Sequence, residues 1–155
     1  MERCVFCNFV GKFEPTTTTE EAVIGERTFT ADVPAERCPS CGEVYTPAGG
    51  PMAFGEALAR QLIADGDVSS PAFRHLRHTL GLTGQALAET LGVTPETVSR
   101  WERGGRPVDR LAWATVATLV LDAIDHSGRM AGVLAACAGV RGPLAPAVRF
   151  NLLAG

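Results

Sequence analysis

Residues 76–104, LRHTLGLTGQALAETLGVTPETVSRWERG, hold the clearest folding signals of this chain. They contain two short segments that can each form a helix with defined ends. Thr83 can cap the start of the first segment, and Gly92 can close it in a left-handed conformation. Thr94 can cap the second segment, where Pro95 fits the first helical turn. The stretch therefore predicts two short helices joined by a tight turn that contains glycine.

Further helix signals lie on both sides of this stretch. A helix is predicted from Ser70 to about Leu80, with Phe73 facing inward, and a longer apolar helix is predicted over residues 108–126. Short capped helices with connections of only a few residues are typical of a helix-turn-helix unit. In such a unit the second helix of the motif presents its first residues to the major groove of DNA.

The helix that begins after Thr94 carries the candidate DNA contacts. Val98 and Trp101 lie three residues apart, so they share one face and are predicted to anchor the helix. A guanidinium group can bond two acceptors on guanine, which makes Arg100 the candidate for direct base contact. Glu96 can accept from cytosine N4, or it can simply stabilise the positive end of the helix dipole. The residues predicted to contact DNA are Gln85, Thr94, Glu96, Thr97, Arg100, Arg103 and Arg106.

Three members of this set are expected at the DNA backbone. Gln85 begins the preceding helix, where a helix N-terminus can hold a phosphate, and Arg103 and Arg106 follow the second helix. The alternative for each arginine, Arg100 included, is a solvated surface position without a partner.

Four cysteines near the start of the chain form two pairs. Cys4 and Cys7 make one C-x2-C pair, and Cys38 and Cys41 make the second after thirty intervening residues. Two such turns supply four thiolates, which suits one tetrahedral, structural Zn²⁺ per chain. Two disulfides or a redox role are the alternatives. Cys137 lies in an apolar stretch and is expected to be a core residue.

The segment between the cysteine pairs is predicted to form strands. Phe29, Ala31 and Val33 alternate with polar residues, and Gly25 offers a turn before them. Residues 1–48 are too few and too polar to build a large core, so a bound metal is expected to stabilise this segment. Residues 46–55 are rich in glycine and proline and are expected to end this module. An amphipathic helix is predicted to follow over residues 56–67.

Composition and charge limit the class of protein. The chain has 155 residues, 46% of them hydrophobic, and shows neither a secretory signal nor an apolar run that could span a membrane. A cytoplasmic protein with no membrane partner is therefore expected. The net charge is −6 over residues 1–68, +2 over residues 69–110 and +1 over residues 111–155. An acidic front and a mildly basic middle suggest two modules with different partners.

The predicted fold class is α+β in two modules, a small zinc-bound N-terminal module that contains β-structure and an all-α helix-turn-helix domain. The predicted boundaries are 1–50 for the zinc module, 51–68 for a helix and linker, 69–128 for the DNA-binding domain and 129–155 for a C-terminal helix and apolar tail. The helix within 108–126 is apolar on nearly every side, which suggests burial in a dimer interface.

The stretch 76–104 resembles the helix-turn-helix of Cro/C1-type repressors, with its V-S-R-W-E-x-G ending. In that group an arginine of the first helix often pairs with the glutamate that closes the recognition helix. The resemblance implies an ion pair between Arg77 and Glu102 here. Such a pair would orient two helices more than it would stabilise the fold, because burying charges is costly.

The two halves together resemble the MqsA-type antitoxins, over residues 1–126. The resemblance implies that the four paired cysteines hold a structural zinc and that Thr97 and Arg100 contact DNA. It also implies that the zinc module binds a partner toxin, while the helix-turn-helix half dimerises and represses its own operon.

The expected function is thus that of a zinc-containing, homodimeric antitoxin bound to a palindromic double-stranded DNA operator. The alternative is a stand-alone transcriptional regulator whose zinc module binds another protein or a ligand. The sequence offers neither a nucleophile–base pair nor an open metal site, so an enzyme is not expected.

Overall fold

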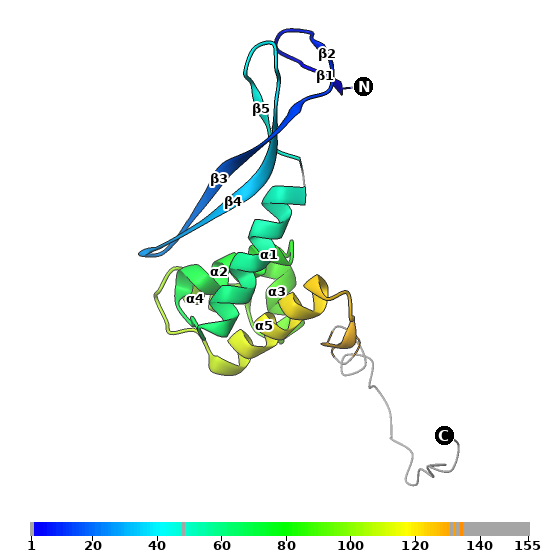
Figure 1. Ribbon diagram of the computed structural model, residues 1–155. Coiled ribbons are helices and arrows are strands. Elements are labelled where there is room, and N and C mark those ends of the chain that lie inside the picture. The colour runs from blue at the N-terminus through cyan, green and yellow to red at the C-terminus, as the bar shows by residue number, and fades with distance from the viewer. Residues whose placement is uncertain (1, 48, 131, 133, 135–155) are drawn as a thin grey trace, which may run out of the picture.

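The computed structural model describes residues 2–47, 49–130, 132 and 134. A half built from strands is followed by a half built from helices, which confirms the α+β fold class (Figure 1). The predicted segment 129–155 lies mostly outside the described residues, and so does Cys137. The strands are β1 (Glu2–Arg3), β2 (Val10–Gly11), β3 (Glu14–Ile24), β4 (Arg27–Arg37) and β5 (Val44–Tyr45).

The strands β3 and β4 form a long antiparallel hairpin. Their register runs from Glu14 opposite Arg37 to Ile24 opposite Arg27, and the short strand β5 pairs with the far end of β4. Gly25 makes the turn with φ of +62°, a conformation that glycine adopts without steric cost. The predicted turn is therefore present, and the Thr-rich run that precedes it lies in β3.

The described helices follow the predicted cap residues closely. The Thr83 hydroxyl accepts from the Ala86 amide at 3.1 Å, and the Thr94 hydroxyl accepts from the Thr97 amide at 3.2 Å. Gly92 closes the earlier helix with φ of +67°. The helices are α1 (Gly49–Ala64), α2 (Ser70–Thr79), α3 (Gly84–Leu91), α4 (Pro95–Glu102) and α5 (Arg110–Ile124).

The core of the helical half forms where these helices meet. The Phe73 ring on α2 meets the Trp101 ring on α4 edge to face, with ring centroids 5.8 Å apart. Val98 and Trp101 are both buried, so the predicted anchoring face of α4 is confirmed. None of the described helices combines the length and apolar composition needed to span a membrane.

The start of α1 corrects one prediction. The local composition predicts that residues 46–55 end the first module and that the helix begins near Glu56, but α1 begins at Gly49. Pro51 is compatible with a first helical turn, because backbone N–H groups in that turn have no acceptor within the helix, so the lack of one in proline costs nothing. Gly50 also approaches the hairpin closely, since a Cβ built on it would lie 3.3 Å from the Cβ of Val33. A tertiary contact thus favours helix in a stretch whose local composition indicates a break.

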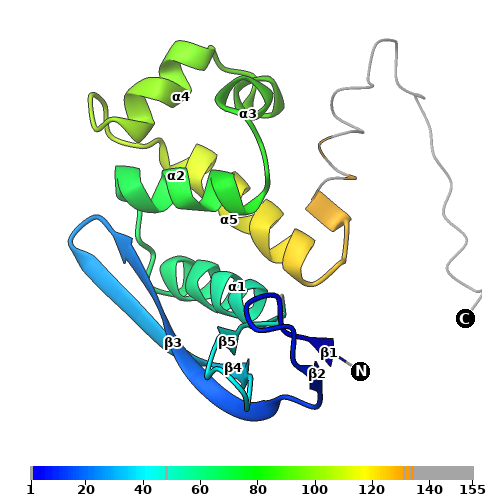
Figure 2. The ribbon, with the colours of Figure 1, turned by 90° about the horizontal axis from the view of Figure 1, so that it is seen from above.

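The helix α1 lies between the hairpin and the other helices. Figure 2 shows the hairpin running beside α1 and reaching α2 with its turn. The same helix contacts α2 and α5 on its other side. The hairpin is therefore joined to the helical half through α1 and, at its turn, through α2.

Candidate metal centre and candidate nucleic-acid interface

The two cysteine pairs sit on turns with the same backbone geometry. In the first turn the Asn8 amide donates to the Cys4 carbonyl at 3.0 Å, and in the second the Gly42 amide donates to the Cys38 carbonyl at 2.9 Å. Asn8 and Gly42 both have a positive φ, of 61° and 79°. Glycine and asparagine tolerate this conformation, which turns the chain sharply after each pair.

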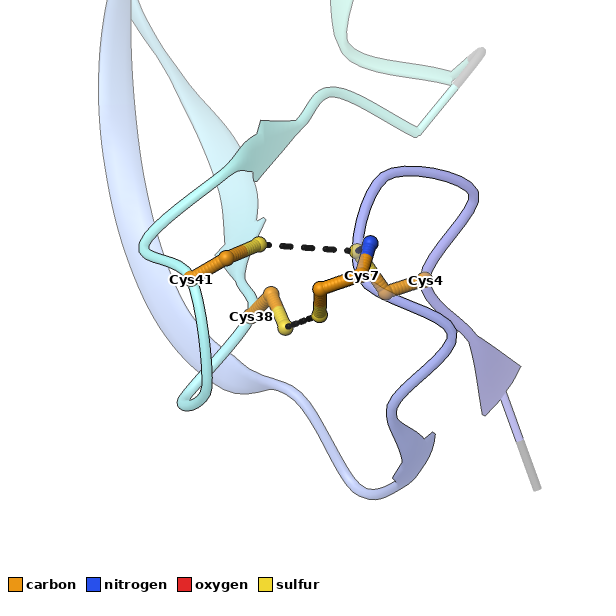
Figure 3. A group of neighbouring side chains, drawn as sticks. All are labelled: Cys4, Cys7, Cys38 and Cys41. Atoms are coloured by element: carbon orange, nitrogen blue, oxygen red, sulfur yellow. Dashed lines mark hydrogen bonds between the residues drawn. The ribbon is translucent and has the colours of Figure 1, made fainter.

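These turns bring all four thiols together (Figure 3). The four sulfur atoms lie within 4.8 Å of one another. The Cys4 and Cys41 sulfurs are 3.6 Å apart and the Cys7 and Cys38 sulfurs 3.7 Å apart, far longer than the roughly 2 Å of a disulfide bond. Four converging thiols are close enough to bind a metal ion and are compatible with zinc.

The ionisation of the cluster favours a cation. Burial of the Cys4 sulfur raises the pKa of this thiol, but hydrogen bonds from the Tyr45 hydroxyl and from nearby backbone amides outweigh that effect and lower the pKa to about 6. A backbone hydrogen bond with Glu43 lowers the pKa of Cys41, yet desolvation and the neighbouring sulfurs raise it to about 12. The Cys4 thiolate therefore forms readily, whereas Cys41 resists deprotonation unless a positive ion lies close to it.

Tyr45 contacts the four-cysteine cluster and was not predicted from the sequence. Its hydroxyl oxygen lies 3.0 Å from the Cys4 sulfur and accepts from the Val5 amide at 3.2 Å. The Tyr45 ring packs on Phe13 with centroids 5.2 Å apart, which fixes the position of the hydroxyl. The hydrogen bond with Cys4 raises the pKa of Tyr45 to about 12, so the phenol stays protonated and can donate to a Cys4 thiolate. A lone tyrosine beyond the second cysteine pair carries no sequence signal for this contact.

We expect Tyr45→Phe to weaken metal binding by about tenfold, because groups that hydrogen-bond to metal ligands typically contribute 10- to 100-fold to affinity. A competition titration against a chromogenic chelator measures the change. Thr19→Val is the control, since its hydroxyl donates to Asp32 on the hairpin, outside the cluster. Equal affinities for Tyr45→Phe and the unmodified protein would contradict a role for this hydroxyl.

The outer face of α4 and the residues just beyond it present most of the predicted DNA contacts to solvent. Glu96 and Arg100 are exposed on α4, and Arg103 and Arg106 are exposed just beyond it. Thr97 is half-buried, and its hydroxyl lies 3.0 Å from that of Thr94. The structure therefore gives Thr94 a capping role at the start of α4.

The start of α3 lies beside this face. The Gln85 side chain is exposed and donates to Glu89 at 3.2 Å. A depression of about 300 Å³ separates the start of α3 from α4, and both Gln85 and Arg103 line it. Arg74 on α2 lines the same depression and was not among the predicted residues, although the helical periodicity places it on the outer face.

The ion pair implied for Arg77 and Glu102 is present. The Arg77 guanidinium binds the Glu102 carboxylate through two nitrogens, and the Nη2–Oε2 distance is 3.0 Å. Arg77 Nη1 also donates to the Leu82 carbonyl at 2.6 Å. Both side chains are nearly buried, and the bonds to Glu102 raise the pKa of Arg77. The pair fixes α2 against the end of α4 and against the turn before α3.

Comparison with known proteins agrees with the geometry of the helical half. A protein-family model described as a helix-turn-helix domain matches residues 72–125. No curated protein and no solved structure matches the chain. The matched range spans α2 to α5 and includes the candidate DNA contacts on α4. Residues 72–125 are a helix-turn-helix domain, a class that suggests DNA binding, and they follow a four-cysteine cluster able to hold a metal ion.

Proposed function

We propose that this protein is a zinc-containing, DNA-binding antitoxin that acts in the cytoplasm, neutralises a partner toxin and represses its own operon. The main observation in support of this proposal is that one chain contains both a candidate metal site and a candidate DNA-binding domain. A cluster of four converged thiols precedes a helix-turn-helix domain whose outer face is exposed. The cluster suits a structural zinc, because four thiolates leave no open position for catalysis.

The DNA contacts are assigned to α4 and its surroundings. Arg100 would read a guanine in the major groove, Thr97 would lie beside it, and Arg103 and Arg106 would contact phosphates. Gln85 and the start of α3 would hold a further phosphate. The net charge of +2 over residues 69–110 has the sign that this role requires.

A homodimer on a palindromic operator is proposed on the outer face of α5. Leu111 is 79% exposed, and Leu121 lies two to three turns further along the same helix. Between them the Thr115 and Thr118 hydroxyls each donate at 2.8 Å to a backbone carbonyl of their own helix, which satisfies these polar groups internally. Together these residues form a stripe on α5 whose threonine hydroxyls already donate hydrogen bonds within the helix. A second copy packed antiparallel on this stripe would pair the same residues twice, as a two-fold interface requires.

The toxin contact is proposed on the N-terminal half. This half carries a net charge of −6 over residues 1–68, which suits a basic, RNA-cleaving toxin. Val5 and Phe6, in the turn between the first two cysteines, are 80% and 73% exposed. Exposed apolar side chains that lie together and are rimmed by polar residues mark protein docking sites.

Fluorescence anisotropy with the DNA upstream of the gene tests the repressor half of this proposal. We expect tight binding to that fragment, weak binding to a scrambled fragment, two protomers per fragment and a clear dependence on salt. Equal, weak binding to both fragments would refute specific repression.

Co-expression with the neighbouring gene tests the antitoxin half. A neighbour that stops growth alone and is tolerated together with this protein supports the antitoxin. A neighbour that is harmless alone would favour a stand-alone regulator instead.

We expect Arg100→Ala to reduce the discrimination between native and scrambled DNA by about 1–3 kcal/mol, because one bidentate base contact is lost. Anisotropy at fixed salt measures the loss on each fragment. Arg60→Ala is the control, since Arg60 is also an exposed arginine but lies on α1 and pairs with Asp125. An equal loss of affinity on both fragments would show that Arg100 binds a phosphate and reads no base.

A further inference from the structure

The turn of the hairpin is packed onto the helical half through an apolar seam. On the hairpin side Ala22 and Phe29 lie opposite each other in the register, and Ile24 follows them toward the turn. These three half-buried residues pack against a buried cluster of the helices α1 and α2, formed by Leu58, Leu62 and Ala72. Burial of several apolar side chains between two elements is the main source of attachment in proteins.

An arginine fastens the same end of the hairpin. Arg27 pairs with Asp65 and, at 3.0 Å, with Asp67, and both acids follow directly on α1. Its guanidinium lies 4.7 Å from the centre of the Phe29 ring. The Asp67 carbonyl in turn accepts from the Trp113 indole of α5 at 2.9 Å. The hairpin is thus connected to both helices that flank the DNA-binding motif.

The strand β4 links this seam to the metal centre without a break. It runs from Arg27 at the seam to Arg37, and Cys38 follows directly. Val33 and Ala35 are buried along the way, and Val33 meets the first turn of α1 at Gly50. A single strand therefore connects the second cysteine pair to the contacts with α1 and α2.

We infer that metal binding at the four thiols stabilises the helix-turn-helix domain through the docked hairpin. A ligand that binds only the folded state stabilises every part that unfolds together with its site. With the thiols free, the described residues at the cysteine end of the N-terminal half retain a small buried cluster around Cys4, Phe13 and Cys38. Loss of order there would release β4 from α1 and expose the seam on α1 and α2. The inference rests on the metal binding proposed above, and it makes the metal state a regulator of DNA-binding competence.

The two tryptophans provide a selective probe of this linkage. Trp101 and Trp113 are the only tryptophans of the chain, and both lie in the helical half. The single tyrosine, Tyr45, lies at the metal centre. Thermal unfolding followed by tryptophan fluorescence therefore reports on the helical half alone, while metal content is measured separately by chelator titration.

We expect one equivalent of zinc, added to the metal-free full-length protein, to raise the tryptophan midpoint by more than about 5 °C, the size of shift that a modest stabilisation produces in a domain of this length. Phe29→Ala should still bind one zinc, but the zinc-dependent rise should fall below about 2 °C. Val23→Ala is the matched control. Val23 neighbours the seam on β3 but is 61% exposed on the opposite face, so the full rise should remain.

A second variant keeps the test decisive if Phe29→Ala does not fold. Arg27→Ala removes only an exposed clamp, and we expect a partial reduction of the zinc-dependent rise with zinc binding intact. An unchanged tryptophan midpoint in the unmodified protein, with zinc demonstrably bound, would overturn the linkage and leave the zinc proposal standing. Absence of zinc binding would overturn both. DNA binding by the zinc-loaded protein is scored independently by anisotropy.

Discussion

Replacing Cys38 with serine is expected to lower the apparent affinity for zinc by roughly 10²–10³-fold. A structural zinc site binds with a free energy of about 10–16 kcal/mol, and this loss corresponds to the contribution of one of its four thiolates. Cys38 is fully buried, and its sulfur lies 3.7 Å from that of Cys7. A serine hydroxyl remains protonated at neutral pH and is a poor ligand for zinc. A competition titration with a chromogenic chelator measures the change in affinity.

The expected structural result of Cys38→Ser is loss of order at the N-terminal end. The described buried cluster there consists of Cys4, Phe13 and Cys38, with Phe9 and Tyr45 packed against it. Such a cluster is too small to hold the two turns without the metal. Ser40→Ala is the control, because Ser40 is exposed in the same turn. Unchanged zinc affinity in Cys38→Ser would exclude the four-cysteine site.

Replacing Arg77 with methionine is expected to destabilise the helical half by about 3 kcal/mol. The Glu102 carboxylate and the Leu82 carbonyl would each lose a donor in a nearly buried position. Removing one partner of a buried ion pair leaves an uncompensated charge, which costs about 3–5 kcal/mol in known cases. Urea unfolding followed by tryptophan fluorescence measures the change in the free energy of unfolding.

The double variant Arg77→Met with Glu102→Leu separates the charge from the packing. We expect it to recover most of the loss, because an apolar pair of similar volume needs no charged partner. Arg74→Met is the matched control on the same helix, since Arg74 is exposed, and its effect should stay within about 0.5 kcal/mol. A single variant as stable as the unmodified protein would mean that the ion pair is dispensable.

The helices α2 to α4 could be predicted closely because their ends depend on neighbouring residues. Thr83 and Thr94 each bond an amide three residues further on. Gly92 ends α3 in the left-handed conformation that glycine favours. Each of these interactions lies within one helical turn, so the order of residue types is enough to place it.

The cysteine cluster was predictable for a different reason. The C-x2-C spacing fixes a tight turn, and each turn needs a residue that tolerates a positive φ at its end, here Asn8 or Gly42. Ligand chemistry then requires two such turns to meet at one ion. The approach of the first turn to the second could be inferred without knowledge of the path between them.

The start of α1 and the role of Tyr45 depend on contacts between distant segments. Gly49 and Gly50 favour a break by local propensity, yet the approach to Val33 places them in a helix. Tyr45 reaches Cys4 across 41 positions of sequence. Neither contact has a spacing that a pattern could detect, because each depends on how two folded elements pack.

The attachment of the hairpin to the helical half is likewise a tertiary result. The alternating pattern correctly places Phe29 on the buried face of its strand. Alternation shows only that one face of a strand is covered, and it does not identify the element that covers it. The covering surface is formed by α1 and α2, and Arg27 finds its acidic partners nearly forty residues away. Capping, turns and ligand spacing are local chemistry that a sequence displays directly. The partner of an apolar face is chosen by shape and packing among elements far apart in the chain, and only the folded structure contains that information.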